Sequence, residues 1–193
     1  MEWEIPASGA GAAKNYAYGA ASITNRTFKI DWGDGSIDSY SGATTVFLTH
    51  TYAAAGTYTV QLYDQADDGI EVMRFGSGTG HSYTGANNQV KDILQWPTSY
   101  SIDSWQKMFF DCDNIGKISA TNIPTLSGTR FLTSLFENSG DNPRLNNSFE
   151  NWDTSNVQDM RYMFKSTKVL NNQYLIDQND LTRSGWTIGS GIT

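Results

Sequence analysis

An apolar pair of residues recurs three times in the second half of the chain, and this recurrence constrains the fold more than any other feature. The pairs are Met108-Phe109, Leu135-Phe136 and Met163-Phe164, and successive pairs lie 27 and 28 residues apart. A repeat of this length is typical of stacked supersecondary units, each too small to bury a core alone. Chains built in this way usually present surfaces and seldom enclose a catalytic site.

The first and third copies align beyond the pair itself. Counted from Ile102 and from Val157, apolar residues recur at positions 0, +3, +6 and +7. This spacing predicts short helical turns that face a shared core, and burial is the usual fate of such side chains. We therefore expect Phe109, Phe136 and Phe164 to lie in one interior column.

The third copy also resembles a known repeat. Its residues read Asn151-Trp152-Asp153-Thr154-Ser155-Asn156-Val157-Gln158-Asp159-Met160-Arg161-Tyr162-Met163-Phe164. This stretch is similar to the surface-protein repeat of mycoplasma lipoproteins and BspA-like bacterial surface proteins. The resemblance implies a leucine-rich-repeat-like solenoid. The copy that begins at Trp96 departs from the pattern at Pro97 and Tyr100, and the middle copy lacks the Trp-x-Thr-Ser start.

The first half of the chain carries β patterns. Apolar and polar residues alternate from Phe28 to Trp32, as on a half-buried strand. Gly33-Asp34-Gly35 then predicts a tight turn, because glycine accepts a positive φ and aspartate bonds to nearby backbone. A further strand is expected from Tyr58 to Leu62, after the turn at Gly56.

These patterns resemble the core of a polycystic-kidney-disease (PKD) domain, which is an immunoglobulin-like β-sandwich. The residues that carry the resemblance are Phe28-Lys29-Ile30-Asp31-Trp32-Gly33-Asp34-Gly35-Ser36, Thr49-His50-Thr51-Tyr52 and Gly56-Thr57-Tyr58-Thr59-Val60-Gln61-Leu62. In the surface-protein family a PKD-like module often precedes the repeats, which is the order found here.

The predicted fold is therefore mainly β with short helical turns, in two parts. Residues 1–64 are expected to form a PKD-like β-sandwich, and residues 65–193 an irregular leucine-rich-repeat-like solenoid with a C-terminal cap. The residues expected in the first coil of the solenoid are Val72, Phe75, Val90, Ile93 and Leu94. Those expected in the cap are Leu181, Trp186 and Ile188.

Composition narrows the class of function. Thirteen basic and twenty acidic residues give a net charge of −7, which argues against binding to a nucleic-acid backbone. No stretch approaches the roughly 20 apolar residues of a membrane span, so no membrane association is expected. The single cysteine, Cys112, excludes an internal disulfide, and its place after Phe109 favours a buried apolar role.

The sequence suggests no catalytic or cofactor site. His50 and His81 are the only histidines, and neither has a convergent set of catalytic partners; His50 is expected to be hydrogen-bonded and structural. Carboxylates gather in three groups, and Ca²⁺ would need several of their oxygens to converge. The groups are Asp31, Asp34 and Asp38; Asp64, Asp67, Asp68 and Glu71; and Asp111 and Asp113. The second is the best calcium candidate, but solvated turns are the preferred interpretation, so no metal is predicted.

The start of the chain, Met1 to Ile5, is acidic and lacks the apolar run of a secretory signal. Either the sequence begins after a leader, or the protein reaches an exterior surface by assembly. The second interpretation predicts a non-enzymatic decoration protein on the exterior of a bacteriophage capsid, bound to the major capsid protein or to copies of itself. Its expected contacts are Met1 to Ile5, Lys14 to Ser22 and an open sandwich edge. The alternative is a bacterial cell-surface adhesin or carbohydrate-binding module that binds host surfaces or glycans.

Overall fold

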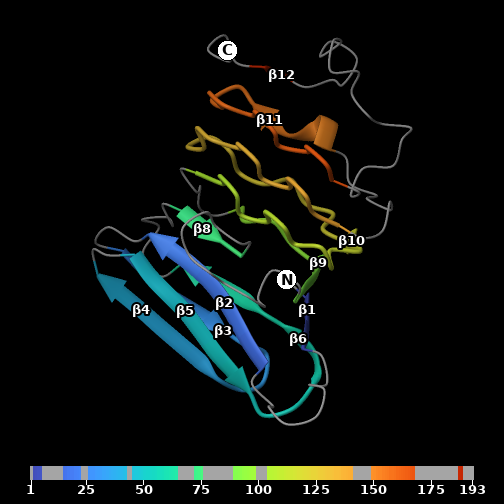
Figure 1. Cartoon of the computed structure of the whole chain (residues 1–193). Coiled ribbons are helices and arrows are strands. Elements are labelled where there is room, and N and C mark those ends of the chain that lie inside the picture. Colours follow the sequence, from blue (N-terminus) through green and yellow to red (C-terminus); the bar gives the residue numbers. More distant parts are fainter. Residues whose placement is uncertain are drawn as a thin grey trace.

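The computed structural model describes residues 2–5, 15–22, 26–42, 45–64, 72–75, 89–98, 104–140, 149–167 and 187–188. Within these ranges the chain is mainly β, as expected, and its single helical element is the short 3-10 helix η1 (Phe149–Asn151). Figure 1 shows the strands of the first half at one end of the molecule and the second half stacked beyond them.

Two antiparallel three-stranded sheets form most of the first half. One has the order β4-β3-β7, with strands β4 (Ile37–Gly42), β3 (Arg26–Asp31) and β7 (Gln61–Asp64). The other has the order β5-β2-β8, with strands β5 (Thr45–Tyr52), β2 (Asn15–Ser22) and β8 (Val72–Arg74). The alternation predicted for β3 is confirmed, because Phe28 and Ile30 are buried while Lys29 and Asp31 remain partly exposed.

The turn between β3 and β4 requires glycine at one position. Gly33 has a φ of +79°, and a Cβ placed there would lie 2.7 Å from the carbonyl oxygen of Thr59. The carboxylates of Asp31 and Asp34 accept hydrogen bonds from the N–H groups of Gly33 and Ser36. These bonds hold the turn in the geometry that the sequence predicted.

A four-stranded sheet joins the two halves of the chain. Its order is β10-β9-β1-β6, with strands β10 (Lys117–Ile118), β9 (Val90–Ile93), β1 (Glu2–Ile5) and β6 (Gly56–Thr59). β1 runs antiparallel to both β6 and β9. All four residues of β1 pair with β6, and Glu2 and Trp3 also pair with β9. The sequence predicted Met1 to Ile5 as a contact for other virion proteins, and this stays a prediction.

Strands of the two halves are interleaved around the predicted boundary between residues 64 and 65. β8 pairs with β2 of the first half, although Val72 was expected in the first coil of the second half. Phe75 follows β8 directly and donates its N–H to the carbonyl of Met108, 2.7 Å away. Phe75 is thus bonded to the first apolar pair of the second half, and the division into residues 1–64 and 65–193 stays a prediction.

The three apolar pairs belong to three segments that lie one above another, which we call the first, second and third repeat coils (residues 104–112, 131–139 and 159–167). Ser104, Phe131 and Asp159 connect neighbouring coils through parallel bridges. N–H groups of the first coil donate to carbonyls of the second in the pairs Trp105–Phe131, Lys107–Thr133, Phe109–Leu135 and Asp111–Glu137. The second coil donates to the third in the pairs Leu132–Asp159, Ser134–Arg161, Phe136–Met163 and Asn138–Lys165.

Each coil consists of two tight turns instead of the predicted helical turn. In the third coil the N–H of Met163 donates to the carbonyl of Met160, and the N–H of Thr167 donates to that of Phe164. One residue inside each turn has a positive φ, which a right-handed helix does not allow. These residues are Lys107, Asp111, Ser134, Asn138, Tyr162 and Ser166, with φ between 53° and 60°.

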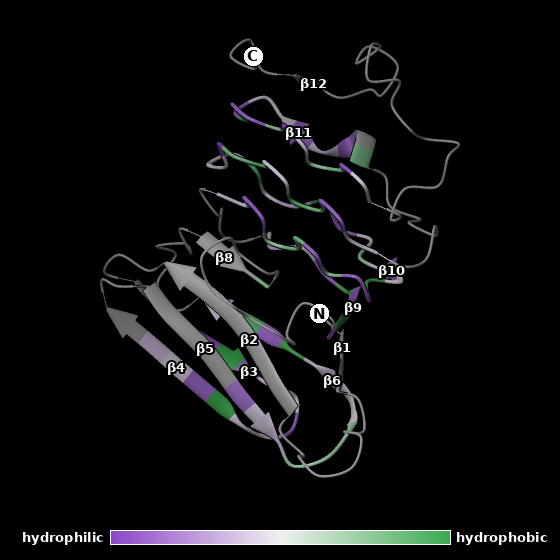
Figure 2. Ribbon diagram, in the orientation of Figure 1, coloured by the Kyte–Doolittle hydropathy of each residue, from purple (hydrophilic) through white to green (hydrophobic). Residues whose placement is uncertain are grey.

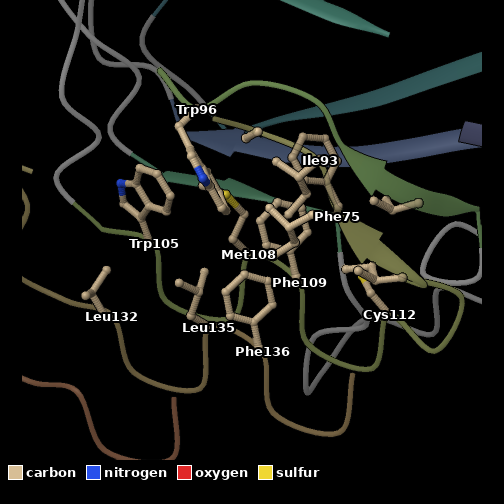
Figure 3. Packing of buried hydrophobic residues seen from close by; sticks show 14 of the residues in the cluster. Phe75, Ile93, Trp96, Trp105, Met108, Phe109, Cys112, Leu132, Leu135 and Phe136 are labelled. Carbon is tan, nitrogen blue, oxygen red and sulfur yellow. The ribbon is translucent and has the colours of Figure 1, made fainter. Parts of the chain in front are cut away.

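The expected column of phenylalanine rings is confirmed. The ring of Phe136 lies 5.3 Å from that of Phe109 and 5.9 Å from that of Phe164, and the three are nearly parallel. The ring of Phe75 extends the column, 5.6 Å from Phe109. Figure 3 shows Phe75, Phe109 and Phe136 among the buried side chains of the stack. The second half therefore has one continuous interior of stacked rings.

A second interior contact joins a residue that precedes the first coil to one that precedes the third. The indoles of Trp96 and Trp152 are both buried and lie edge to face, 5.1 Å apart. Pro124 stands midway between them in sequence, 28 residues from each, and is also buried. The middle copy thus has a proline where the other two have a tryptophan, and those two tryptophans contact each other directly.

The prediction of the buried residues at the start of the stack is partly confirmed. Phe75, Val90 and Ile93 are buried, as expected of the first coil, but Leu94 is 36% exposed. Leu94 lies just beyond the end of β9, and the strand itself does not alternate strictly, because Asp92 and Ile93 are both buried. Figure 2 shows this mixture of apolar and polar residues along each coil.

At the other end of the stack, β11 (Asp153–Thr154) pairs in parallel with β12 (Thr187–Ile188). The backbone of Ile188, which was predicted in the cap, thus lies beside β11 at this end. Leu181 and Trp186 lie outside the described residues, and the cap stays a prediction.

Candidate functional site

His50 of β5 and Asp34 of the β3–β4 turn form a close pair. The Nε2 atom of His50 lies 2.7 Å from Oδ2 of Asp34, and the two side chains are 12% and 20% exposed. The imidazole stacks on the indole of Trp32 at 4.8 Å, and the ring of Tyr52 meets it edge-on at 4.6 Å. The hydroxyl of Tyr52 donates to the carbonyl of Trp32. The cluster thus ties the turn to β5.

The charge of Asp34 is stabilised in this cluster. Partial burial raises the pKa of its carboxyl, but hydrogen bonds from His50 and Ser36 outweigh that effect and hold the pKa below its usual value of 3.8. Trp32 and Tyr52 both pack against the imidazole, and His50 has the hydrogen-bonded position that the sequence predicted for it.

The first group of carboxylates does not converge on a common point. Asp31 accepts from the N–H of Gly33, and Asp34 contacts His50. Asp38 accepts a hydrogen bond from the indole N–H of Trp32, at 2.7 Å. A calcium site needs several oxygens aimed at one ion, whereas each of these three carboxylates is hydrogen-bonded to partners of its own.

The other carboxylate groups give no metal site in the described part of the chain. Asp111 accepts a hydrogen bond from the side-chain amide of Asn138 at 3.0 Å. No group of three or more His, Cys, Asp and Glu side chains that could hold a metal occurs among the described residues. The side chains of the preferred calcium candidate, and the second histidine, lie outside them: Asp64, Asp67, Asp68, Glu71 and His81.

Cys112 is fully buried, as the sequence predicted. Burial, and to a lesser degree the negative charges of Asp113 and Asp111, raise the pKa of the thiol well above its usual value. A reactive cysteine needs a thiolate at neutral pH, which burial disfavours here, so the buried position supports the packing role that the sequence predicted.

The outward side chains of the three repeat coils form a second candidate surface, which we call the turn face. Lys165 of the third coil contacts Glu137 of the second, with Nζ 2.8 Å from Oε1. Burial raises the pKa of Glu137, but its hydrogen bonds with Lys165 and Ser134 and the charges of Lys165 and Lys107 lower it below the usual 4.5. This ion pair therefore connects the second and third coils.

Each coil also presents an aromatic ring with a cation over it. The cation lies 4.9 to 5.3 Å from the ring centroid, within the range of a cation–π interaction. The pairs are Lys107 over Phe110, Arg130 over Phe131 and Lys165 over Tyr162. Tyr162 is 59% exposed. The turn face thus offers aromatic, cationic and hydrogen-bonding groups, and the three rings stand at different positions of their coils.

Sequence reasoning did not single out the turn face. The sequence prediction rested on the apolar positions of the repeat and not on its polar positions. The signal was present, because Phe110, Glu137 and Lys165 occupy the same position two residues before the end of the tight turns, 27 and 28 residues apart. Reading these columns across the copies would have placed Glu137 beside Lys165.

No helix in the described residues is long and apolar enough to span a membrane. In a comparison with protein families, residues 80–181 match the family described as Mycoplasma protein of unknown function, DUF285. Because this match covers more than half of the 193 residues, the chain belongs to that family. Neither the curated proteins nor the solved structures contain a significant match.

Proposed function

We propose that this member of the DUF285 family is a non-enzymatic recognition protein displayed at a bacterial cell surface, where its turn face binds a partner. The observation that carries the proposal is the repeated backbone of the three coils, whose hydrogen bonds recur residue by residue while the outward side chains differ. Stacked repeats of this kind create extended binding surfaces. Membership of a mycoplasma family and the resemblance of residues 151–164 to a surface-protein repeat support the location.

The architecture we propose is an immunoglobulin-like, PKD-like sandwich followed by a leucine-rich-repeat-like solenoid. The two antiparallel sheets that meet at Trp32 and His50 support the first part. The parallel bridges at Ser104, Phe131 and Asp159 support the second. In this arrangement the first half serves as a base, and the coils carry the binding surface away from it.

Glycans are the ligand class we propose for the turn face, as expected of an adhesin or carbohydrate-binding module. Exposed aromatic rings provide flat apolar contacts, and neighbouring charged and amide side chains provide hydrogen bonds. Tyr162 is the most exposed of the turn-face rings, at 59%, with Lys165 beside it. Tyr162 and Lys165 are therefore the first residues to substitute in a binding test.

The test compares the full chain with single variants on a glycan array and on host cells. Tyr162→Asn removes the ring and keeps a residue type that tolerates the positive φ of this position. Ile37→Asn is the matched control, since Ile37 is similarly exposed, at 58%, but lies in β4 of the first half. We expect binding to fall for Tyr162→Asn alone. Equal binding by both variants and the parent would refute the turn face as the site.

The bacteriophage hypothesis stays a prediction that rests on the start of the sequence. Deleting Met1 to Ile5 is not a clean test of it, because β1 pairs with both β6 and β9 and its loss would disturb the fold. Co-sedimentation of the full chain with purified capsids is the better measurement. Stoichiometric binding to capsids, without glycan binding, would favour decoration over adhesion.

A further inference from the structure

Arg161 of the third coil holds its guanidinium in a fixed orientation on the turn face. Its Nε and Nη2 atoms donate to the carboxylate of Asp159 at 3.1 and 2.7 Å, and its backbone N–H donates to the same carboxylate at 2.9 Å. Asp159 also accepts a hydrogen bond from the side chain of Thr133 in the second coil. The guanidinium is therefore oriented before a ligand binds, which reduces the entropy that binding costs.

The other edge of the same guanidinium keeps unused donors. Asp159 takes one N–H from Nε and one from Nη2, which leaves a parallel pair of N–H groups on Nη1 and Nη2. Within the part of the chain that the structure describes, no acceptor lies on Nη1 of Arg161. The side chain is 68% exposed. A parallel pair of N–H groups matches the two oxygens of a carboxylate or a sulfate.

In the ion pairs of Arg161 and Lys165 the cation is the outer member. The side chain of Arg161 is 68% exposed and that of Asp159 only 19%, and the corresponding values are 55% for Lys165 and 11% for Glu137. Tyr162 is 59% exposed, and the amine of Lys165 lies 4.9 Å from the centre of its ring. A ligand that approaches the third coil therefore meets cations and an aromatic ring, while the carboxylates lie beneath them.

The charge of the whole chain does not attract an anion, because it is −7. At physiological salt, however, exposed charges separated by more than about 8 Å are largely screened. Recognition at the third coil therefore depends on the groups in contact with the ligand. A neutral sugar offers Arg161 only hydroxyl groups, whereas an acidic sugar forms charge-assisted hydrogen bonds, which are about twice as strong.

We propose that the third coil selects acidic glycans, in which a sugar bears a carboxylate or a sulfate group. The acidic group binds the unused edge of the Arg161 guanidinium, the sugar ring packs on Tyr162, and Lys165 adds a second positive charge. Asp159 is a positioning residue, because it acts through Arg161. This inference rests on the proposed function, since it names the class of glycan that the turn face binds.

The experiment titrates the full chain with lactose, sialyllactose and sulfated lactose. The last two differ from lactose by a carboxylate-bearing sugar and by a sulfate group, so the comparison identifies which anion is bound. We expect at least one acidic sugar to bind about five- to ten-fold more tightly than lactose. Equal affinity for all three, lost in Tyr162→Asn, would overturn the inference and leave the glycan-binding function standing. No binding to these sugars or to a glycan array would refute the proposed function and the inference with it.

Variants of Arg161 test its role directly, and its exposure means that the fold should tolerate them. Arg161→Gln should weaken binding of the acidic sugar about three- to ten-fold and leave lactose unaffected. Arg161→Lys keeps the charge without the paired N–H groups and should not restore the affinity. Lys29→Gln is the charge-matched control, since it removes a cation from β3 in the first half. An equal loss in Lys29→Gln, or full binding by Arg161→Lys, would overturn the proposal, and thermal unfolding checks that each variant is folded.

Discussion

The ring of Phe164 lies parallel to that of Phe136, within 3° and with 5.9 Å between centroids. The two rings differ in their surroundings, because Phe136 is fully buried and Phe164 remains partly exposed. The same residue type at the same position of successive coils therefore contributes unequally to stability, and the difference is measurable.

Truncation of the central ring should cost much more than truncation of the last. Phe136→Ala removes a ring held between Phe109 and Phe164, so we expect a loss of about 3–5 kcal/mol in the free energy of unfolding. Phe164→Ala should cost less, about 1–3 kcal/mol, because water already reaches part of that ring. Urea unfolding of the two variants gives the comparison. An equal or larger loss for Phe164→Ala would show that the column continues beyond it.

The two glycines of the β3–β4 turn should respond differently to alanine. Gly35 has a φ of +94° with nothing within 4 Å of a Cβ, so Gly35→Ala should cost about 1–2 kcal/mol through backbone strain. Gly33→Ala adds a clash with the backbone of Thr59 and should cost about 1–3 kcal/mol more than Gly35→Ala. Thermal unfolding of both variants measures the difference. Equal costs would mean that β6 moves aside without penalty.

Some of this structure follows from sequence and some does not, for identifiable reasons. The spacing of the apolar pairs was enough to place Phe109 and Phe136 in one column, because a repeated unit stacks in register. The tight turns could not be predicted, because their left-handed positions hold residues such as Lys107 and Tyr162 and no glycine. In the first and second coils, carbonyls of the following coil accept N–H groups of these turns, and such long-range contacts are not visible in the local sequence.

Contacts between residues far apart in the sequence could not be predicted either. β1 has four residues, and nothing local indicates that it pairs with both β6 and β9. The contact between Asp34 and His50 likewise joins residues 16 apart. The turn sequence and the alternating strand were each predictable, but their meeting depends on how the two sheets pack.

Stability should fall in acid partly through Glu137. Its pKa in the folded chain is below the usual 4.5, so the unfolded chain binds the proton more readily. The stabilisation from this group is present above about pH 4.5 and is lost as the pH falls through the lower, folded pKa. Glu137→Gln removes this titration, so the free energy of unfolding should fall less steeply between about pH 5 and about pH 3. An unchanged slope in urea titrations would exclude Glu137 as a contributor.

Removal of the partner gives the complementary result. Lys165→Met leaves the largely buried carboxylate of Glu137 without its cation. The variant should therefore be less stable than the parent at neutral pH, and the difference should shrink as Glu137 becomes protonated. Lys117→Met is a useful comparison, since Lys117 pairs with buried Asp92 in the sheet that joins the halves.

Cys112 should report global unfolding without taking part in function. Its thiol is fully buried and its pKa is raised, first by burial and then by Asp113 and Asp111. Because only the exposed thiolate reacts, a thiol reagent should leave the native chain unmodified and label one site per chain in urea. The labelling rate at low denaturant should then follow the opening of the coil stack, and Phe136→Ala should accelerate it. Rapid labelling of the native parent would contradict the buried position of this side chain between the first and second coils.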